Sequence, residues 1–305
     1  MSNEELQNKF IELIQLAQES RIDISGEMGR LQKKIRSSTQ TENAWKHVEL
    51  ARHVERPYSL DYINRIFSDF TELHGDRAFG DDPAIVGGLA FFDHQPVTII
   101  GHQKGRTLEQ RVLRNGGMAN PEGYRKAMRL AKEAEKFKRP VITFVDTPGA
   151  YPGLGAEERG IGESIARNLR EWSRLKTPVI CIIIGEGGSG GALGICVGDR
   201  VYMLENSVYS VISPEGCASI LLRDSSRAKD AAAMLRISSE DLMAFKVIDG
   251  IIKEPSGGAH SDPDATAAAI KEILAKDIPA LMKCGTEELL CARNKKIRAI
   301  GHYGG

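Results

Sequence analysis

Two consecutive segments of the sequence repeat the same order of elements. Residues 139–145 read RPVITFV and residues 177–184 read TPVICIII, and each segment leads into a glycine-rich turn and then a helical pattern. A strand that is apolar on both faces and alternates with helices is typical of a buried, mainly parallel sheet. The repeat therefore predicts an α/β fold in which both turns follow the carboxyl ends of core strands.

The flanking regions predict a three-part chain. Residues 1–53 contain few Gly or Pro residues, and Leu6, Phe10 and Leu13 recur at helical spacing. Such helices either fold back on their own domain or pack against a partner. Residues 254–264 are rich in turn residues, and an Ala-rich helical pattern follows from about Asp262. We expect a helical N-terminal extension (1–55), an α/β core (56–258) and a C-terminal helical tail (259–305). Helix 59–70 is expected to begin with Ser59 as its N-cap.

Composition narrows the classes of function. The 305 residues include 41 basic and 41 acidic side chains, and this balance argues against bulk binding to nucleic acid or to a membrane surface. No apolar run approaches the ~20 residues of a membrane span, and the polar amino end lacks a signal-peptide pattern. The five cysteines form no C-x-x-C pair, so we expect no metal site and a cytoplasmic protein with buried thiols.

The glycine cluster in PVICIIIGEGGSGGALGICVGD matches two well-known motifs. Gly185, Gly187 and Gly190 spell the dinucleotide-binding pattern G-x-G-x-x-G. That interpretation is disfavoured because the helix that follows is too short for a crossover along a sheet. It ends before Gly198, where a new strand begins. Glu205 stands about where the acidic ribose ligand would be expected.

The same cluster also contains G-x-S-x-G, the nucleophile elbow of a serine hydrolase, with Ser189 at its centre. A hydrolase needs a histidine base. His260 and His302 follow the serine, but they lie in the linker and at the tail. His102, at the end of a predicted core strand, is the one histidine near the expected site. This interpretation is weakened but stays open.

A third interpretation uses the backbone alone. Where a strand leads into a helix, the first N–H groups of the helix lack partners, and glycines let a ligand oxygen approach them. Two such amides stabilise an oxyanion, and losing one donor typically slows a reaction by about 10²–10³. The loop of DTPGAYPGLGAEERG follows the preceding strand, so we expect it at the same edge of the sheet. Glu157 and Glu158 in that loop are expected to be solvated.

Several long strings resemble one known family. DTPGAYPGLGAEERG, GEGGSGGALGICVGDRVYML and YSVISPEGCASIL look like the alpha subunit of bacterial acetyl-coenzyme A carboxylase carboxyltransferase, as do RPYSLDYINRIFSDFTELHGDRAFGDD and GHQKGR upstream. The resemblance extends from about residue 4 to about residue 300. It implies a crotonase/ClpP-like α/β fold of repeated ββα units.

The resemblance also implies a reaction and partners. Members of the family transfer a carboxyl group from carboxybiotin, which is carried on a biotin carboxyl carrier protein, to acetyl-CoA. The product is malonyl-CoA for fatty acid biosynthesis, and a biotin carboxylase completes the complex. A beta subunit supplies most of the acetyl-CoA site and the zinc, so this chain is expected to bind no metal. An α2β2 heterotetramer is likewise implied.

Residue roles are carried over from the family motif. They place the catalytic amide pair at Gly190 and Gly191, facing the carbonyl oxygen of biotin. The cofactor serves as the base, and Gly191→Val is expected to abolish transfer without disturbing assembly. Arg106, Arg125 and Lys126 either contact the carrier or CoA phosphates or are merely solvated. The biotin-binding residues implied by the motif are Gly149, Ala150, Gly153 and Gly188.

Three alternatives remain open from the sequence. A crotonase-fold hydratase or isomerase would need its own acid or base at the active edge. A ClpP-like serine hydrolase would use Ser189, and a fluorophosphonate probe would label it. A non-enzymatic scaffold of a carboxylase complex would keep its role after any change at Gly190 and Gly191.

Overall fold

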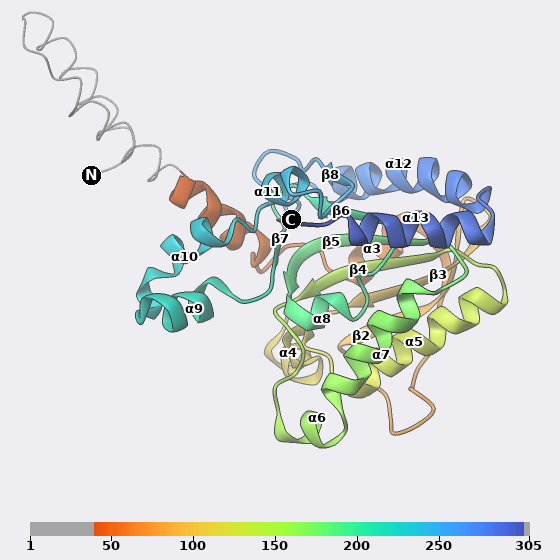
Figure 1. Ribbon diagram of the computed structural model, residues 1–305, viewed down its shortest axis with the longest axis horizontal. Coiled ribbons are helices and arrows are strands. Elements are labelled where there is room, and N and C mark those ends of the chain that lie inside the picture. Colours follow the sequence, from red (N-terminus) through yellow and green to blue (C-terminus); the bar gives the residue numbers. More distant parts are fainter. Residues whose placement is uncertain (1–39, 302–305) are drawn as a thin grey trace, which may run out of the picture. The chain divides into compact units, whose positions relative to one another are not determined.

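The computed structural model describes residues 40–301 (Figure 1). The chain divides into two compact units. The larger comprises His47–Ser213 and the residues from Ile237 onward, and the smaller comprises Pro214–Arg236 with the residues up to Lys46. The three-part division at residues 55 and 258 stays a prediction. The helical pattern around Leu6 and the residue His302 lie outside the described residues.

The larger unit is built on one sheet. Within residues 40–301 its eight strands take the order β1-β2-β3-β4-β5-β6-β8, and β7 pairs with β5. β1, β2 and β3 are antiparallel neighbours, whereas all pairings from β3 through β8 are parallel. The predicted mainly parallel sheet is thus confirmed. The strands are β1 (Ser68–Glu72), β2 (Ile85–Phe92), β3 (Gln95–His102), β4 (Val141–Thr147), β5 (Val179–Gly188), β6 (Arg200–Leu204), β7 (Val208–Ser210) and β8 (Gly250–Ile252).

The central strands are buried because helices cover both faces of the sheet. Every residue of β4 is buried, and so are the first nine residues of β5. This is why their sequences are continuous apolar runs instead of alternating patterns. β2 and β3 form a hairpin whose turn residues Asp93 and His94 have φ values of 44° and 69°. Positive φ at both turn positions suits the right-handed twist of the two strands.

Helices pack on each face of the sheet (Figure 1). α5 and α7 contribute to one apolar cluster with residues of β2, β4 and β5, while α3 and α12 contribute to a second cluster on the opposite face. α5 begins with Pro121 at its first turn, as expected for a residue that lacks an N–H donor. The helices are α3 (Ser59–Ile66), α4 (Leu108–Leu113), η1 (Asn115–Gly117), α5 (Pro121–Lys136), α6 (Leu154–Glu158), α7 (Ile161–Ser173), α8 (Ser189–Leu193), α11 (Ser239–Ala244), α12 (Pro263–Met282) and α13 (Thr286–Arg298).

The beginning of α3 corrects the expected cap. Tyr58 occupies the N-cap position, and its N–H donates to the carboxylate of Asp61 at 2.7 Å. Ser59 is already inside the helix, fully buried, and its hydroxyl donates to the carbonyl of His102. The serine therefore fixes the end of β3, a long-range contact that a capping pattern does not reveal.

The smaller unit is helical in its described part. It contains α9 (Pro214–Cys217), a π-helical turn η2 (Ala218–Leu222), η3 (Ser225–Arg227) and α10 (Ala228–Leu235). The carboxylate of Asp224 accepts from Ser226 N at 2.9 Å and so caps η3. Across both units, none of the helices in residues 40–301 combines the length and the apolarity that a membrane span requires.

Candidate functional site

The glycine cluster ends β5 and begins α8. Gly188 is the N-cap, and Gly190 and Gly191 are the second and third residues of a helix of five residues. The first amides of a helix have no carbonyl partner within it. We call the backbone N–H groups of Gly190 and Gly191 the amide pair. So short a helix cannot run back along the sheet, which agrees with the sequence argument against dinucleotide binding.

The two glycine turns meet at the carboxyl edge of the sheet, as predicted. A methyl group on Gly191 would lie 2.4 Å from the carbonyl carbon of Gly149 and 2.6 Å from the amide nitrogen of Ala150. A methyl group on Gly188 would lie 2.2 Å from the carbonyl oxygen of Pro148. Gly188 and Gly191 thus need to be glycines for the backbone of this turn to contact the backbone of residues 148–150. The expectation that Gly191→Val leaves assembly with the beta subunit intact stays a prediction, and any side chain at Gly191 requires the backbone of Gly149 and Ala150 to move.

Gly190 is different because a side chain there would not overlap backbone. A methyl group on Gly190 would make an ordinary contact of 3.7 Å with Ile165. The same residue lines a pocket of about 370 Å³, whose other walls are largely apolar. The amide pair thus begins at the rim of an apolar pocket. The pocket residues are Ser189, Gly190, Leu193, Tyr209, Ser210, Val211, Leu242 and Val247.

The second turn is held by its own side chains. The hydroxyl of Thr147 donates to the Gly149 carbonyl at 2.6 Å and accepts from the Gly149 amide at 3.1 Å. Gly149 and Ala150 therefore lie against the amide pair, together with Gly188. Gly153 does not share these contacts. It is the N-cap of α6, and its closest neighbour is the ring of Tyr151.

Buried hydrogen bonds fix the position of α8. The hydroxyl of Tyr124, on α5, donates to the carbonyl of Gly191 at 3.3 Å. The side-chain amide of Asn168, on α7, donates to the carbonyls of Gly194 and Tyr124, both at 2.9 Å. Helices on one face of the sheet thereby orient the short helix that carries the amide pair.

His102 lies at the end of β3, where the sequence placed it, and is fully buried. Neither ring nitrogen has a hydrogen bond of good geometry among residues 40–301, although the backbone of Gly191 lies close enough to the ring to raise its pKa slightly. Burial, with the charge on Lys104 adding to it, lowers the pKa of His102 to about 3, so the ring is neutral. Ser189 has φ 49°, a left-handed conformation that also occurs at nucleophile elbows. However, no carboxylate accepts a hydrogen bond from His102 among the described residues, so they do not form a Ser-His-acid catalytic triad.

A cluster of four charged side chains lies just before the two turns, and the sequence argument did not identify it. Lys104 Nζ lies 2.8 Å from Asp146 Oδ1 and 2.9 Å from Glu186 Oε2, and Arg52 Nε lies 2.7 Å from Glu186 Oε1. Burial by itself would raise the pKa of Glu186, but the two cations outweigh it and hold the pKa at about 2. The available signal was a charged residue near the end of each of three neighbouring buried strands, namely Lys104, Asp146 and Glu186.

The basic residues considered for phosphate binding are engaged within the chain. Arg125 Nε lies 2.7 Å from Asp76, and Arg106 lies 2.6 Å from Asp61. Lys126 is fully buried. Glu157 and Glu158, by contrast, are exposed at the end of α6, as predicted. Arg125 and Lys126 are therefore structural residues of the fold.

The cysteines follow the expected pattern in part. Cys181, Cys196 and Cys217 are buried, whereas Cys284 is half-buried and Cys291 is exposed. Among residues 40–301 no three His, Cys, Asp or Glu side chains are grouped so that they could hold a metal ion.

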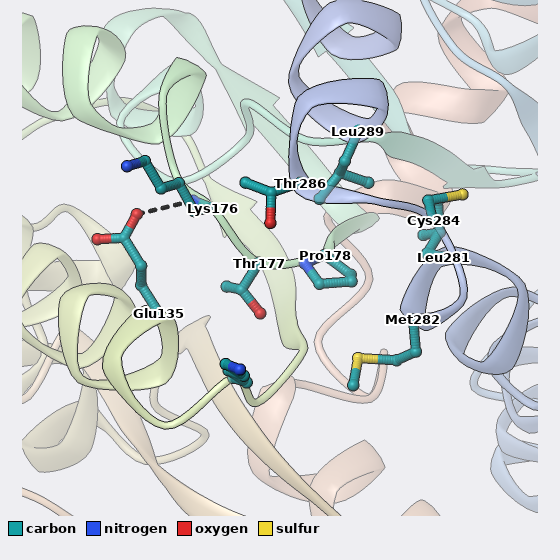
Figure 2. A pocket seen from close by; sticks show the side chains of 10 residues that line it. Glu135, Lys176, Thr177, Pro178, Leu281, Met282, Cys284, Thr286 and Leu289 are labelled. Carbon is teal, nitrogen blue, oxygen red and sulfur yellow. Dashed lines mark hydrogen bonds between the residues drawn. The ribbon is translucent and has the colours of Figure 1, made fainter.

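A second pocket, of about 380 Å³, lies at the opposite end of β5 (Figure 2). Thr177 and Pro178, which precede that strand, form one wall, and Leu281 and Cys284 form another. The side chain of Glu135 accepts from the amide of Lys176 at 2.7 Å. The pocket is at the amino edge of the parallel strands, whereas ligands of open α/β sheets bind at the carboxyl edge.

Comparison with known proteins assigns the family. A family model for acetyl co-enzyme A carboxylase carboxyltransferase-like proteins matches residues 2–301. The protein named acetyl-coenzyme A carboxylase carboxyl transferase subunit alpha from Treponema denticola is 66% identical over 303 residues, which are 99% of each chain. Its namesake from Fusobacterium nucleatum is 55% identical over 304 residues, 98% of this chain and 97% of that protein.

Solved structures agree on the fold. A chain of the Pseudomonas malonate decarboxylase hetero-tetramer has a TM-score of 0.62 at 17% identity, covering 79% of this chain and 95% of that chain. The transcarboxylase 12S core has a TM-score of 0.57 at 22% identity, covering 74% and 44%. These likenesses confirm the predicted crotonase-like α/β fold. Together with the family model and the relatives, they show that this chain belongs to the family of acetyl-coenzyme A carboxylase carboxyltransferase alpha subunits and is a subunit of a transferase.

Proposed function

We propose that this chain, together with a beta subunit, transfers the carboxyl group of carboxybiotin to acetyl-CoA and so forms malonyl-CoA for fatty acid biosynthesis. The names of the relatives support the reaction. The observation that carries the assignment to a site is the amide pair, which lies beside the Gly149 turn and at the rim of an apolar pocket. Gly190 and Gly191 are the proposed catalytic residues.

The pocket suits a small bicyclic ring with one polar end. A volume of about 370 Å³ with mainly apolar walls accepts the ring, while the amide pair offers donors to its carbonyl oxygen. Carboxybiotin would supply the carboxyl group and, once that group has left the ring and before it joins acetyl-CoA, a basic ring nitrogen that can take the α-proton. Gly149, Ala150 and Gly188, which lie beside the amide pair and do not line the pocket, are the proposed biotin-binding residues. Gly153 has a supporting role in that turn, because its contacts are with Tyr151.

The chain's own residues contribute fixed donors. Tyr124 and Asn168 hold the carbonyls of α8, so the amide pair is oriented before the ligand arrives. Donors that need no rearrangement stabilise developing negative charge more strongly than water does. We therefore assign to the amide pair the stabilisation of the charge that forms on the biotin oxygen.

No side chain at the pocket is suited to be a general base. Among the described residues that line it, Tyr209 is the one titratable group, and burial raises its pKa well above the usual value. His102 is neutral but fully buried, and Glu186 is tied to two cations. A hydratase or isomerase would need such a base. The lack of such a base among the described pocket residues favours a reaction in which the substrate itself supplies the base.

The remaining partners follow from the same proposal. A beta subunit would provide most of the acetyl-CoA site and the zinc, and a biotin carboxyl carrier protein with its biotin carboxylase would deliver carboxybiotin. We propose an α2β2 assembly in the cytoplasm. Fold relatives that occur as a hetero-dimer and a hetero-tetramer, both malonate decarboxylases, support a multi-subunit arrangement.

The test is a carboxyl-transfer assay on complexes reconstituted with the beta subunit. Gly190→Val keeps the backbone N–H but adds a branched side chain beside it, where a Cβ meets Ile165 and no backbone. If this bulk keeps the biotin oxygen from the amide pair, malonyl-CoA formation should fall on the order of 100-fold or more. The matched control is Gly162→Val on α7, where a methyl group meets nothing within 4 Å. Equal activity of the two variants would overturn the assignment of the amide pair.

A further inference from the structure

The pairing of β4 with β5 is interrupted immediately before the two glycine turns. Val145 pairs with Ile183, and the next pair is Thr147 with Gly187. β4 therefore advances by two residues while β5 advances by four, so β5 carries two extra residues at this point. Such an irregularity removes ladder hydrogen bonds and re-aims the strand that contains it. The relative position of the two turns is thus not set by the regular ladder.

Side chains replace the missing ladder bonds. Asp146 Oδ1 accepts from the amide of Glu186 at 2.9 Å. Lys104, two residues after the end of β3, places its ammonium group between the two carboxylates, at 2.8 Å and 2.9 Å. One lysine from the loop after β3 thus joins Asp146, directly before Thr147, to Glu186 among the extra residues of β5.

This cluster is largely shielded from water. Side-chain exposure is 14% for Lys104, 2% for Asp146 and 12% for Glu186. Burial by itself would lower the pKa of Lys104, but Asp146 and Glu186 raise it above its usual value. Two carboxylates this close repel each other strongly unless a cation lies between them. With Arg52, the cluster contains two positive and two negative charges and is balanced.

We propose that Lys104 is a positioning residue that locks the offset between β4 and β5 and so holds the amide pair opposite Gly149 and Ala150. The effect on catalysis rests on the proposed function, whereas the effect on the two turns does not. Lys104 acts through Asp146 and Glu186. A displacement of about 1 Å at a catalytic group can reduce turnover about 100-fold.

The first readout is the pH profile of reconstituted complexes. Lys104→Met should lower kcat about 10- to 100-fold at pH 8. Its activity relative to wild type should rise as the pH falls towards 6, because without Lys104 burial raises the pKa of Glu186, and a protonated Glu186 no longer repels Asp146. Adding Glu186→Gln should restore much of the activity at pH 8, since a neutral amide can donate towards Asp146. Lys253→Met, which removes an exposed lysine paired with Glu205, is the matched control.

The second readout is amide hydrogen exchange of the chain itself and needs no activity. Exchange in the segments 147–150 and 187–192 should be about tenfold faster or more in Lys104→Met than in wild type or Lys253→Met. The Lys104→Met/Glu186→Gln double variant should return towards the wild-type rates. The two proposals can fail separately. If the wild-type complex transfers no carboxyl group but the variants still show these differences in exchange, the proposed function is overturned and the role of Lys104 stands.

Several results would overturn the proposal. The first is that the Lys104→Met complex keeps the same fraction of wild-type activity at every pH and that adding Glu186→Gln does not restore activity. Another is unchanged exchange in both turns. An unfolded double variant would also count against the proposal, because Lys104 would then be needed for folding and not for placing the turns. If Lys104→Met alone fails to fold, a folded and active double variant supports the proposal.

Discussion

Gly190 and Gly191 are neighbours in the chain but have different surroundings. Backbone atoms of Gly149 and Ala150 occupy the space where a side chain on Gly191 would lie, whereas Gly190 borders the pocket. The sequence motif predicted the pair as one functional unit. It could not separate the two residues, because the difference depends on a turn about forty positions earlier in the chain.

This difference predicts unequal effects on stability. Gly191→Ala should lower the free energy of unfolding by about 1–3 kcal/mol or more, since backbone must move to admit the methyl group. Gly190→Ala should change it by less than about 0.5 kcal/mol. Urea denaturation of the purified chain measures both values. Equal losses for the two variants would contradict the packing of the two turns.

At the scale of elements, α5 links the site to a buried carboxyl group. Asp82 Oδ2 accepts from the amide of Asn120, directly before α5, at 2.7 Å. The same helix carries Tyr124, which bonds Gly191. Burial, opposed by backbone hydrogen bonds, raises the pKa of Asp82 from 3.8 to about 6. Asp82 therefore ionises at a higher pH in the folded chain than in the unfolded chain.

The raised pKa predicts a pH dependence of stability. Between about pH 4 and pH 6 the folded state binds a proton that the unfolded state has released, so the unfolding free energy falls as the pH rises. Asp82→Asn removes this contribution. The stability difference between variant and wild type should shift in favour of the variant by about 2 kcal/mol from pH 4 to pH 7. A difference that does not change with pH, in urea titrations at each pH, would contradict the assignment.

Long periodic elements were predictable from the sequence, and long-range polar contacts were not. The strands around Ile142 and Ile182 and the helix beginning at Pro121 follow from apolar runs and from helix-start signals. The roles of Ser59 and Lys104 depend on partners 43 and 42 or more positions away, such as His102 and Asp146. No local pattern encodes such pairs, although the charged residues that end buried strands mark where to look.

At the scale of the whole molecule, the proposed function implies that this chain carries only part of the active site. The pocket and the amide pair offer an oxyanion site, but the described residues that line the pocket include no cationic side chain for a CoA phosphate. Arg125 and Lys126 are engaged by aspartates. The central claim is therefore that the active site is divided between two subunits.

Malonyl-CoA formation from carboxybiotin and acetyl-CoA, measured for this chain alone, for the beta subunit alone and for the two combined, tests that claim most directly. We predict turnover for the combined subunits and none above background for either chain by itself. A parallel mixture with Gly190→Val in this chain should stay near background, which ties the activity to the amide pair. Malonyl-CoA formation by the isolated chain would contradict the divided site.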